Sequence, residues 1–187
     1  MPDYRRWRIP GGSYYFTVVT AGRRPILTTD LGRQCLHEAL EEVKAEKPFE
    51  IFATVLLPDH LHSVWNLPAG DADFSSRWGD VKTAFTKKYL SNGGEEIPIS
   101  KSRRAKGERG IWQRRFWEHF VRNDDDLKRC VDYIHGNPLK HGYVSTVKDW
   151  RWSSFQRFVQ AGEYSENWGT NIEIAFDPDL FGDEAYA

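Results

Sequence analysis

The stretch with the clearest chemical potential is Pro-Asp-His-Leu-His at residues 58–62. On a β-strand, residues two apart point to the same face, so His60 and His62 would aim both imidazoles at one spot while Leu61 faces the other way. Imidazole is the commonest side-chain ligand for metal ions. The pair is therefore half of a candidate metal site, although two histidines at this spacing are more often polar residues on a solvated face.

A second informative stretch is Asp-Tyr-Ile-His-Gly-Asn-Pro at residues 132–138. Tyr133 and Asn137 are four residues apart, so they share one face of a helix. That face flanks an apolar stripe, and we expect the Tyr133 hydroxyl to reach out of the core. The commoner role of such a tyrosine is to pack its ring at a boundary and leave its hydroxyl in water.

The elements that must position these residues follow from hydrophobic periodicity and turn signals. Strands are expected at residues 14–20, 49–57, 60–67 and 116–121, and helices at residues 30–47, 73–91, 124–137 and 150–158. The second strand is nearly all apolar and is expected to be central. It should pair antiparallel with the third strand, because the connection is short. The third helix is expected to end at Asn137-Pro138, since a residue before proline avoids helical angles.

This order of elements predicts an α+β fold of the ferredoxin-like, split β-α-β type, with an antiparallel sheet, helices packed on it and a C-terminal extension. The length of 187 residues suits one domain with a sizeable core, and 40% of the residues are apolar. No apolar run approaches the roughly 18 residues of a membrane helix, and no signal peptide is evident. A cytoplasmic protein is expected, with Cys35 and Cys130 as buried free thiols.

The net charge of −1 hides a strong asymmetry. From residue 163 onward there are seven acidic and no basic residues, whereas the first 162 residues carry 26 basic and 20 acidic ones. Basic residues gather in 1–24 and 101–115, and residues 93–110 are expected to form a mobile basic loop. Such local surpluses favour an anionic partner, although a solvated basic loop would show the same pattern.

Five short motifs in order along the chain resemble those of one known family. They are residues 4–6 (Tyr-Arg-Arg), 55–62 (Val-Leu-Leu-Pro-Asp-His-Leu-His), 111–119 (Ile-Trp-Gln-Arg-Arg-Phe-Trp-Glu-His), 133–142 (Tyr-Ile-His-Gly-Asn-Pro-Leu-Lys-His-Gly) and 150–155 with its paired serines. The second resembles the His-hydrophobic-His motif of the HUH single-tyrosine transposases. The set as a whole resembles the REP-associated tyrosine transposases, over roughly residues 3–158.

The resemblance implies metal-dependent cleavage and rejoining of single-stranded DNA beside small palindromic hairpins, the repetitive extragenic palindromes (REP). It implies that His60 and His62 are metal ligands and that Tyr133 is the nucleophile, which forms a 5′-phosphotyrosine. Asn137 matches the position that completes the metal site, and its amide oxygen suits Mg²⁺ or Mn²⁺. A monomer associated with the nucleoid is expected.

The substrate surface is predicted from charge. Arginines and lysines could hold backbone phosphates, and three tryptophans could stack on unpaired bases. The cations are Arg5, Arg6, Arg8, Lys82, Lys87, Arg103, Arg104, Arg114 and Arg115, and the tryptophans are Trp7, Trp112 and Trp117. Arg114 and Arg115 are the strongest candidates, because the family-like segment places them just before a strand.

The acidic residues suggest that the chain divides into a transposase domain, 1–160, and a C-terminal tail, 161–187. The tail could regulate the domain by folding over the basic surface, or it could simply aid solubility.

Two other functions stay open from the residues alone. One is a protein that binds hairpins without cutting them. The other is a zinc hydrolase in which His60 and His62 are joined by His119 or Glu118.

Overall fold

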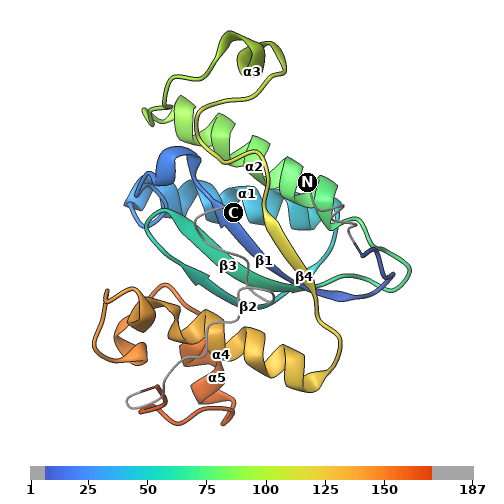
Figure 1. Ribbon diagram of the computed structural model, residues 1–187, viewed down its shortest axis with the longest axis vertical. Helices are drawn as coiled ribbons and strands as arrows, with labels where there is room; N and C mark the ends of the chain where they lie inside the picture. Colours follow the sequence, from blue (N-terminus) through green and yellow to red (C-terminus); the bar gives the residue numbers. More distant parts are fainter. Residues whose placement is uncertain (1–6, 170–187) are drawn as a thin grey trace, which may run out of the picture.

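The computed structural model describes residues 7–169, in which four strands form one antiparallel sheet in the order β2-β3-β1-β4. The strands are β1 (Ser13–Val19), β2 (Glu50–Leu56), β3 (His60–Asn66) and β4 (Trp117–Phe120). Helices α1 (Asp30–Glu46) and α2 (Phe74–Ser91) cover one face, and α4 (Asp124–Lys140) and α5 (Phe155–Gln160) lie on the other (Figure 1). The predicted α+β, ferredoxin-like fold is confirmed.

The face under α1 and α2, called here the α1/α2 face, is closed by aromatic rings. Trp65 of β3 and Trp78 of α2 stack with their ring centroids 4.1 Å apart, and Phe16 of β1 meets both rings edge-on. All three side chains are buried. Aromatic pairs of this kind contribute about 0.5–1.5 kcal/mol beyond the burial of their area, so this face anchors the fold.

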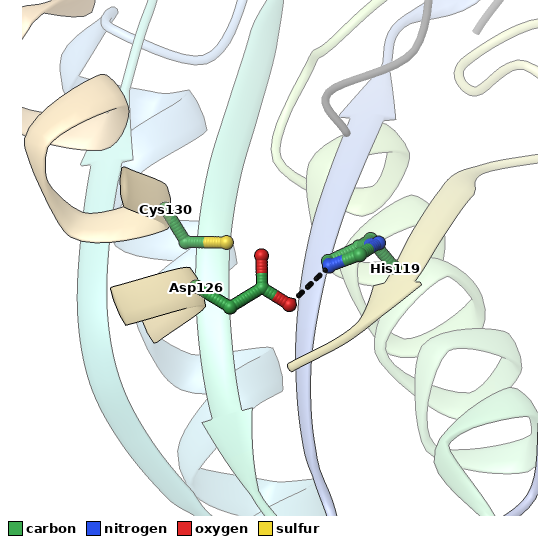
Figure 2. A group of neighbouring side chains, drawn as sticks. All are labelled: His119, Asp126 and Cys130. Atoms are coloured by element: carbon green, nitrogen blue, oxygen red, sulfur yellow. Dashed lines mark hydrogen bonds and ion pairs between the residues drawn. The ribbon is translucent and has the colours of Figure 1, made fainter. Parts of the chain in front are cut away.

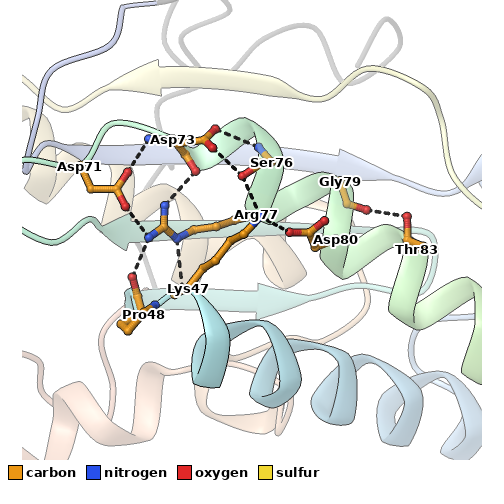
Figure 3. A network of polar contacts seen from close by, with 9 residues as sticks. All are labelled: Lys47, Pro48, Asp71, Asp73, Ser76, Arg77, Gly79, Asp80 and Thr83. Carbon is orange, nitrogen blue, oxygen red and sulfur yellow. Dashed lines mark hydrogen bonds and ion pairs between the residues drawn. The ribbon is translucent and has the colours of Figure 1, made fainter.

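A buried arginine joins the end of α1 to the start of α2 (Figure 3). The Arg77 guanidinium donates to the carboxylate of Asp71 at 2.6 Å and to the carbonyl oxygens of Lys47, Pro48 and Asp73 at 3.2, 3.0 and 2.9 Å. A buried charge is tolerated when it is paired and hydrogen-bonded in this way. The Arg77 guanidinium also holds the pKa of the Asp71 carboxyl below its usual value.

Strand β2 lies at the edge of the sheet, so the expectation of a central second strand is wrong. Its outer edge is covered by the segment after α4, because Leu56 N donates to the Trp152 carbonyl at 2.8 Å and Ser154 N to that of Thr54 at 2.9 Å. This cover explains the apolar sequence of an edge strand and protects its backbone from pairing with another chain.

Helix α4 continues through Pro138 to Lys140, whereas the sequence predicts its end at Asn137-Pro138. A proline this close to a helix end removes one hydrogen bond in the last turns, and the His141 amide still closes on the Asn137 carbonyl at 3.0 Å. At the other end, the Asn123 side chain accepts from the Asp126 amide. Asn137 therefore stays on the same helix face as Tyr133.

The basic segment 93–110 contains a short helix, α3 (Lys101–Ala105), and several ion pairs, where the sequence predicts a mobile loop. Glu96 pairs with Arg104 and Arg109, and Glu108 pairs with Arg103 at 2.7 Å. Ion pairs within the segment thus order part of a region that its composition alone predicts to be a mobile loop.

Three further expectations concern the chain as a whole. Cys35 and Cys130 are buried free thiols, as predicted. Within residues 7–169, no helix is both long and apolar enough to cross a membrane. The predicted acidic tail, 161–187, lies outside the described residues from residue 170 onward. In its described part, Tyr164 and Trp168 pack against Phe155 of α5.

Candidate active site

The structure brings the predicted chemical residues of β3 and α4 together between the sheet and the helix. Strand period two sends His60 and His62 to the face that α4 covers, while Leu61 and Trp65 join the α1/α2 core. The ring centroids of His60 and His62 are 5.0 Å apart, and those of His62 and Tyr133 are 5.3 Å apart. All of these side chains are buried.

A row of side chains spaced by four residues runs along α4 to its C-cap, His141. Tyr133 contacts His62 at one end of the row, and the ring of His141 lies 5.3 Å from that of His60 at the other. Asn137, four residues from each, lies between them. The sequence reading missed His141, although continuing the four-residue spacing beyond Asn137 would have found it.

Hydrogen bonds at the Nδ1 atoms orient both imidazoles of β3. His60 Nδ1 lies 2.7 Å from the Asp59 carboxylate, which in turn accepts from the guanidinium of Arg23 at 3.0 Å. Burial raises the pKa of the Asp59 carboxyl, but the interactions with His60 and Arg23 outweigh burial and bring it below the usual value. A carboxylate behind an imidazole is a common support for a ligating histidine.

His62 is oriented by two hydroxyl groups of β1. Its Nδ1 atom lies 2.6 Å from the hydroxyl of Tyr15 and 3.0 Å from that of Thr17. Because Nδ1 is engaged in both histidines, Nε2 is the atom of each ring that can serve as a ligand. Neither Tyr15 nor Thr17 was singled out from the sequence.

The buried polar atoms of this site suit a divalent metal ion. Among the described residues, His60 Nε2 and both amide atoms of Asn137 have no hydrogen-bond partner. Leaving such a group unsatisfied costs about 1–3 kcal/mol. Imidazole nitrogen and amide oxygen are both ligands for Mn²⁺ and related ions, so the donor set fits a metal.

The Tyr133 hydroxyl is covered by a lysine from the end of the same helix. Lys140 Nζ donates to the Tyr133 oxygen at 2.8 Å and lies 4.9 Å from the centroid of its ring. Tyr133 is only 1% exposed. The expectation that its hydroxyl reaches out of the core is therefore wrong, because the last turn of α4 brings Lys140 over it.

A second group of possible ligands lies at the start of α4 (Figure 2). The candidate ligand atoms of His119, Asp126 and Cys130 are all within 4.8 Å of one another, and His119 Nε2 is 2.9 Å from Asp126. The guanidinium groups of Arg122 and Arg129 also hold the Asp126 carboxylate, at 2.8 and 3.2 Å. Two cations beside the carboxylate already offset its charge.

The protonation of this group points to a structural role. Burial raises the pKa of the Asp126 carboxyl, but hydrogen bonds from Arg122 and the interaction with His119 outweigh it and hold the pKa far below its usual range. Burial raises the pKa of the Cys130 thiol to about 12, so sulfur is protonated at neutral pH. The group clamps the start of α4 to β4.

The zinc alternative gains no support from these positions. His119 is held by Asp126, and β1 lies between its strand and β3. Glu118 pairs with Phe16 in the register and so faces α1 and α2, away from the two histidines.

The predicted DNA-binding cations divide into three groups. A groove of about 610 Å³ between α2 and the segment 103–114, which includes part of α3, is lined by Lys82, Lys87, Arg103 and Arg114. Arg8 and Arg115 are exposed, and Arg104 pairs with Glu96. Arg5 and Arg6 lie outside the described residues.

The three tryptophans also differ in their surroundings. Trp112 is buried against Phe85, with ring centroids 4.9 Å apart, and therefore packs in the core. Trp117 is half-buried, and Trp7 is 70% exposed. Trp7 thus has the open ring face that base stacking needs.

Comparisons with known proteins agree with this architecture. The model of the family described as transposase IS200 like matches residues 10–137. The REP-associated tyrosine transposase of Escherichia coli is 44% identical over 173 residues, which are 92% of this chain and 93% of that protein. A solved structure of the REP-associated tyrosine transposase bound to a REP hairpin is 42% identical, with a TM-score of 0.76 over 95% of each chain.

The fold and these matches define an enzyme of the HUH tyrosine class of DNA transposases. Within that class, the chain belongs to the REP-associated tyrosine transposases. The resemblance carried by the five sequence motifs is confirmed.

Proposed function

We propose that this enzyme cuts and rejoins single-stranded DNA beside REP-type hairpins, with Tyr133 as the nucleophile. The observation that carries the proposal is the packing of Tyr133 on α4 against His62 on β3, with ring centroids 5.3 Å apart. A relative of similar fold was solved bound to a REP hairpin, which supports the choice of substrate.

His60, His62 and Asn137 are the proposed ligands of Mg²⁺ or Mn²⁺. When bound, the ion would offset the charge of the scissile phosphate and orient it. The chain's own contribution is to keep both imidazoles in place. Asp59 fixes His60, while Tyr15 and Thr17 fix His62.

Tyr133 performs the transfer itself. Its phenolic oxygen forms a bond to phosphorus while the bond from phosphorus to O3′ breaks, so the products are a 5′-phosphotyrosine and a 3′-hydroxyl. The phenolic proton passes to solvent, and the departing oxygen takes one up. Since the covalent bond retains the phosphodiester energy, a 3′-hydroxyl of another strand can reverse the step without ATP.

The basic groove beside α2 is the proposed path of the DNA backbone. It gathers four of the nine predicted cations from segments that are distant in sequence. Cations that contact phosphates position nucleic acid without reading its sequence. We propose that Arg8, Arg104 and Arg115, with Arg5 and Arg6, extend this surface, and that the enzyme acts as a monomer.

The test is incubation of the full chain with a labelled hairpin carrying single-stranded flanks, in Mg²⁺ or Mn²⁺. Wild type should form a covalent adduct that survives denaturation, and Tyr133→Phe should form at least about 1,000-fold less. Tyr164→Phe is the matched control, because that hydroxyl donates to Asp132 and the ring packs against His135, so in the described part of the chain neither contacts the two histidines of β3.

Two outcomes would contradict the proposal. An adduct retained in Tyr133→Phe would exclude this tyrosine as the nucleophile. Hairpin binding by wild type with neither adduct nor cleavage would favour the alternative of a binding protein without catalytic activity.

A further inference from the structure

Resting on the proposed role of Tyr133, we propose that Lys140 is a second catalytic residue, whose ammonium stabilises the negative charge that develops on the Tyr133 oxygen. Lys140 Nζ lies 2.8 Å from that oxygen, the atom that would react. It also lies over the ring, 4.9 Å from the centroid, so the ammonium interacts with both the hydroxyl oxygen and the aromatic ring.

The continuation of α4 past Pro138 creates this contact. Residues seven apart lie on the same face of a helix, two turns from one another. If α4 ended at Asn137, as its sequence predicts, Lys140 would leave this face. The hydrogen bond from the His141 amide to the Asn137 carbonyl closes the last turn and keeps Lys140 above Tyr133.

Burial makes the contact electrostatically significant. Tyr133 is 1% exposed, whereas Lys140 is exposed, so the ammonium stands between the phenolic oxygen and solvent. Charge-assisted hydrogen bonds are roughly twice as strong as neutral ones, and their effect grows where water is excluded. A preorganised cation beside an oxygen that gains negative charge is a frequent source of rate acceleration.

Lys140 would act in both directions of the transfer. As the oxygen–phosphorus bond forms, the ammonium offsets charge on the attacking oxygen and keeps its own three protons. In the reverse step it stabilises the same oxygen as a leaving group. A phosphate that approaches the oxygen from solvent also meets the ammonium, which helps to hold it in line.

A lysine elsewhere on α4 provides the matched control. Lys128 is exposed and pairs with Asp132 at 2.6 Å, on a face of the helix different from that of Tyr133. Its replacement removes one positive charge from the same helix without touching the proposed reacting oxygen. Exposed pairs of this kind contribute less than about 1 kcal/mol to stability.

The experiment measures adduct formation in single turnovers, with the full chain in excess over labelled hairpin, and hairpin affinity separately. Lys140→Met should slow adduct formation about 10–100-fold and weaken binding less than about threefold. Lys140→Arg should retain most of the rate, because it restores the cation. Lys128→Met should match wild type, and thermal unfolding should verify that every variant is folded.

Fluorinated tyrosine at position 133 separates a charge effect from a structural one. Fluorine withdraws electrons and stabilises charge on the oxygen from within the ring, so the defect of Lys140→Met should shrink at least about fivefold in that protein. An undiminished defect, or an equal defect in Lys128→Met, would overturn the role of Lys140.

The outcomes also separate this inference from the proposed function. If the adduct depends on Tyr133 but Lys140→Met reacts at the wild-type rate, only the role of Lys140 fails. If Tyr133→Phe still forms the adduct, the proposed function itself fails.

Discussion

The two faces of the central sheet use the same strands for different purposes. On the α1/α2 face, Trp65 and Trp78 stack closely, and even the buried charge of Arg77 is satisfied by four acceptors. On the face under α4, His60 Nε2 and the Asn137 amide are buried without hydrogen-bond partners among residues 7–169. Within the same range, the α1/α2 face also buries the indole N–H groups of Trp78 and Trp112 without partners, but an indole N–H is a donor and cannot ligate a metal ion. The unpartnered atoms under α4 include an imidazole nitrogen and an amide oxygen, which are ligand types.

Strand β3 shows how one element serves both purposes. Its side chains alternate, so Leu61 and Trp65 enter the core while His60 and His62 face α4. A site with unsatisfied polar atoms lowers stability, and a well-packed opposite face offsets that cost. Substitutions at the polar site on the α4 face should therefore destabilise the fold far less than substitutions in the aromatic cluster on the α1/α2 face.

The largest effect on folding is expected from Trp78→Ala. Removal of this buried ring from the stacked cluster should lower the free energy of unfolding by about 3–5 kcal/mol, measured by denaturant titration without metal. Tyr133→Phe loses only one hydroxyl and should cost less than about 1.5 kcal/mol. Equal losses in the two variants would contradict the division between the faces.

Asn137→Ala tests the comparison of the two faces at the candidate metal site under α4. Without metal, relief of the unsatisfied amide should nearly cancel the lost packing, so the free energy of unfolding should change by less than about 1 kcal/mol. With Mn²⁺ at about 100 times its dissociation constant, wild type should gain about 2.7 kcal/mol and the variant much less.

Asn66→Ala is the control for the metal response. Its side-chain amide is satisfied by Ser13 and Glu50, so its removal should leave the stabilisation by Mn²⁺ intact. A full response to Mn²⁺ in Asn137→Ala would exclude Asn137 as a ligand.

The buried imidazole of His135, which packs against Phe155 of α5, predicts that the stability of the fold depends on pH. Burial, followed by the charge of Arg157, lowers the pKa of His135 to about 3. Between that value and about 6.5, the unfolded chain binds the proton and the folded chain does not, so stability falls on acidification. His135 should therefore lower the free energy of unfolding by about 2 kcal/mol when the pH falls from 7 to 5.

His135→Gln should flatten that dependence, measured as the free energy of unfolding at each pH. His37→Gln, which replaces an exposed histidine of α1, should leave the slope unchanged. An equally steep slope in His135→Gln would show that other groups dominate acid destabilisation.

The smallest effect is expected in the groove beside α2. Arg114→Ala removes a cation whose side chain is 72% exposed, and it should weaken hairpin affinity about 3–10-fold and reduce the salt slope of binding by about one. Cleavage at saturating DNA should be unchanged. Lys44→Ala on α1 is the control, and an equal loss there would indicate nonspecific attraction.

Local patterns predicted most of the elements and the pairing of site residues. Period two places His60 and His62 on one strand face, and a spacing of four places Tyr133 and Asn137 on one helix face, because backbone geometry alone sets both periods. The four strands and the main helices were predicted for the same reason. The central position of β2 and the end of α4 at Pro138 were predicted wrongly, since covering segments and terminal hydrogen bonds override local preference.

What the sequence by itself determined is which residue types share a face of each element. Only the tertiary structure decided that α4 lies against β3, that Asp59 and Arg23 support His60, and that Lys140 covers Tyr133. The packing of α4 on β3 and the Arg23–Asp59 pair join segments more than 30 residues apart. The Asp59–His60 contact depends on the turn between β2 and β3, and the Lys140 contact depends on how α4 ends. Their geometry follows from the packing of the whole chain, which no local period encodes.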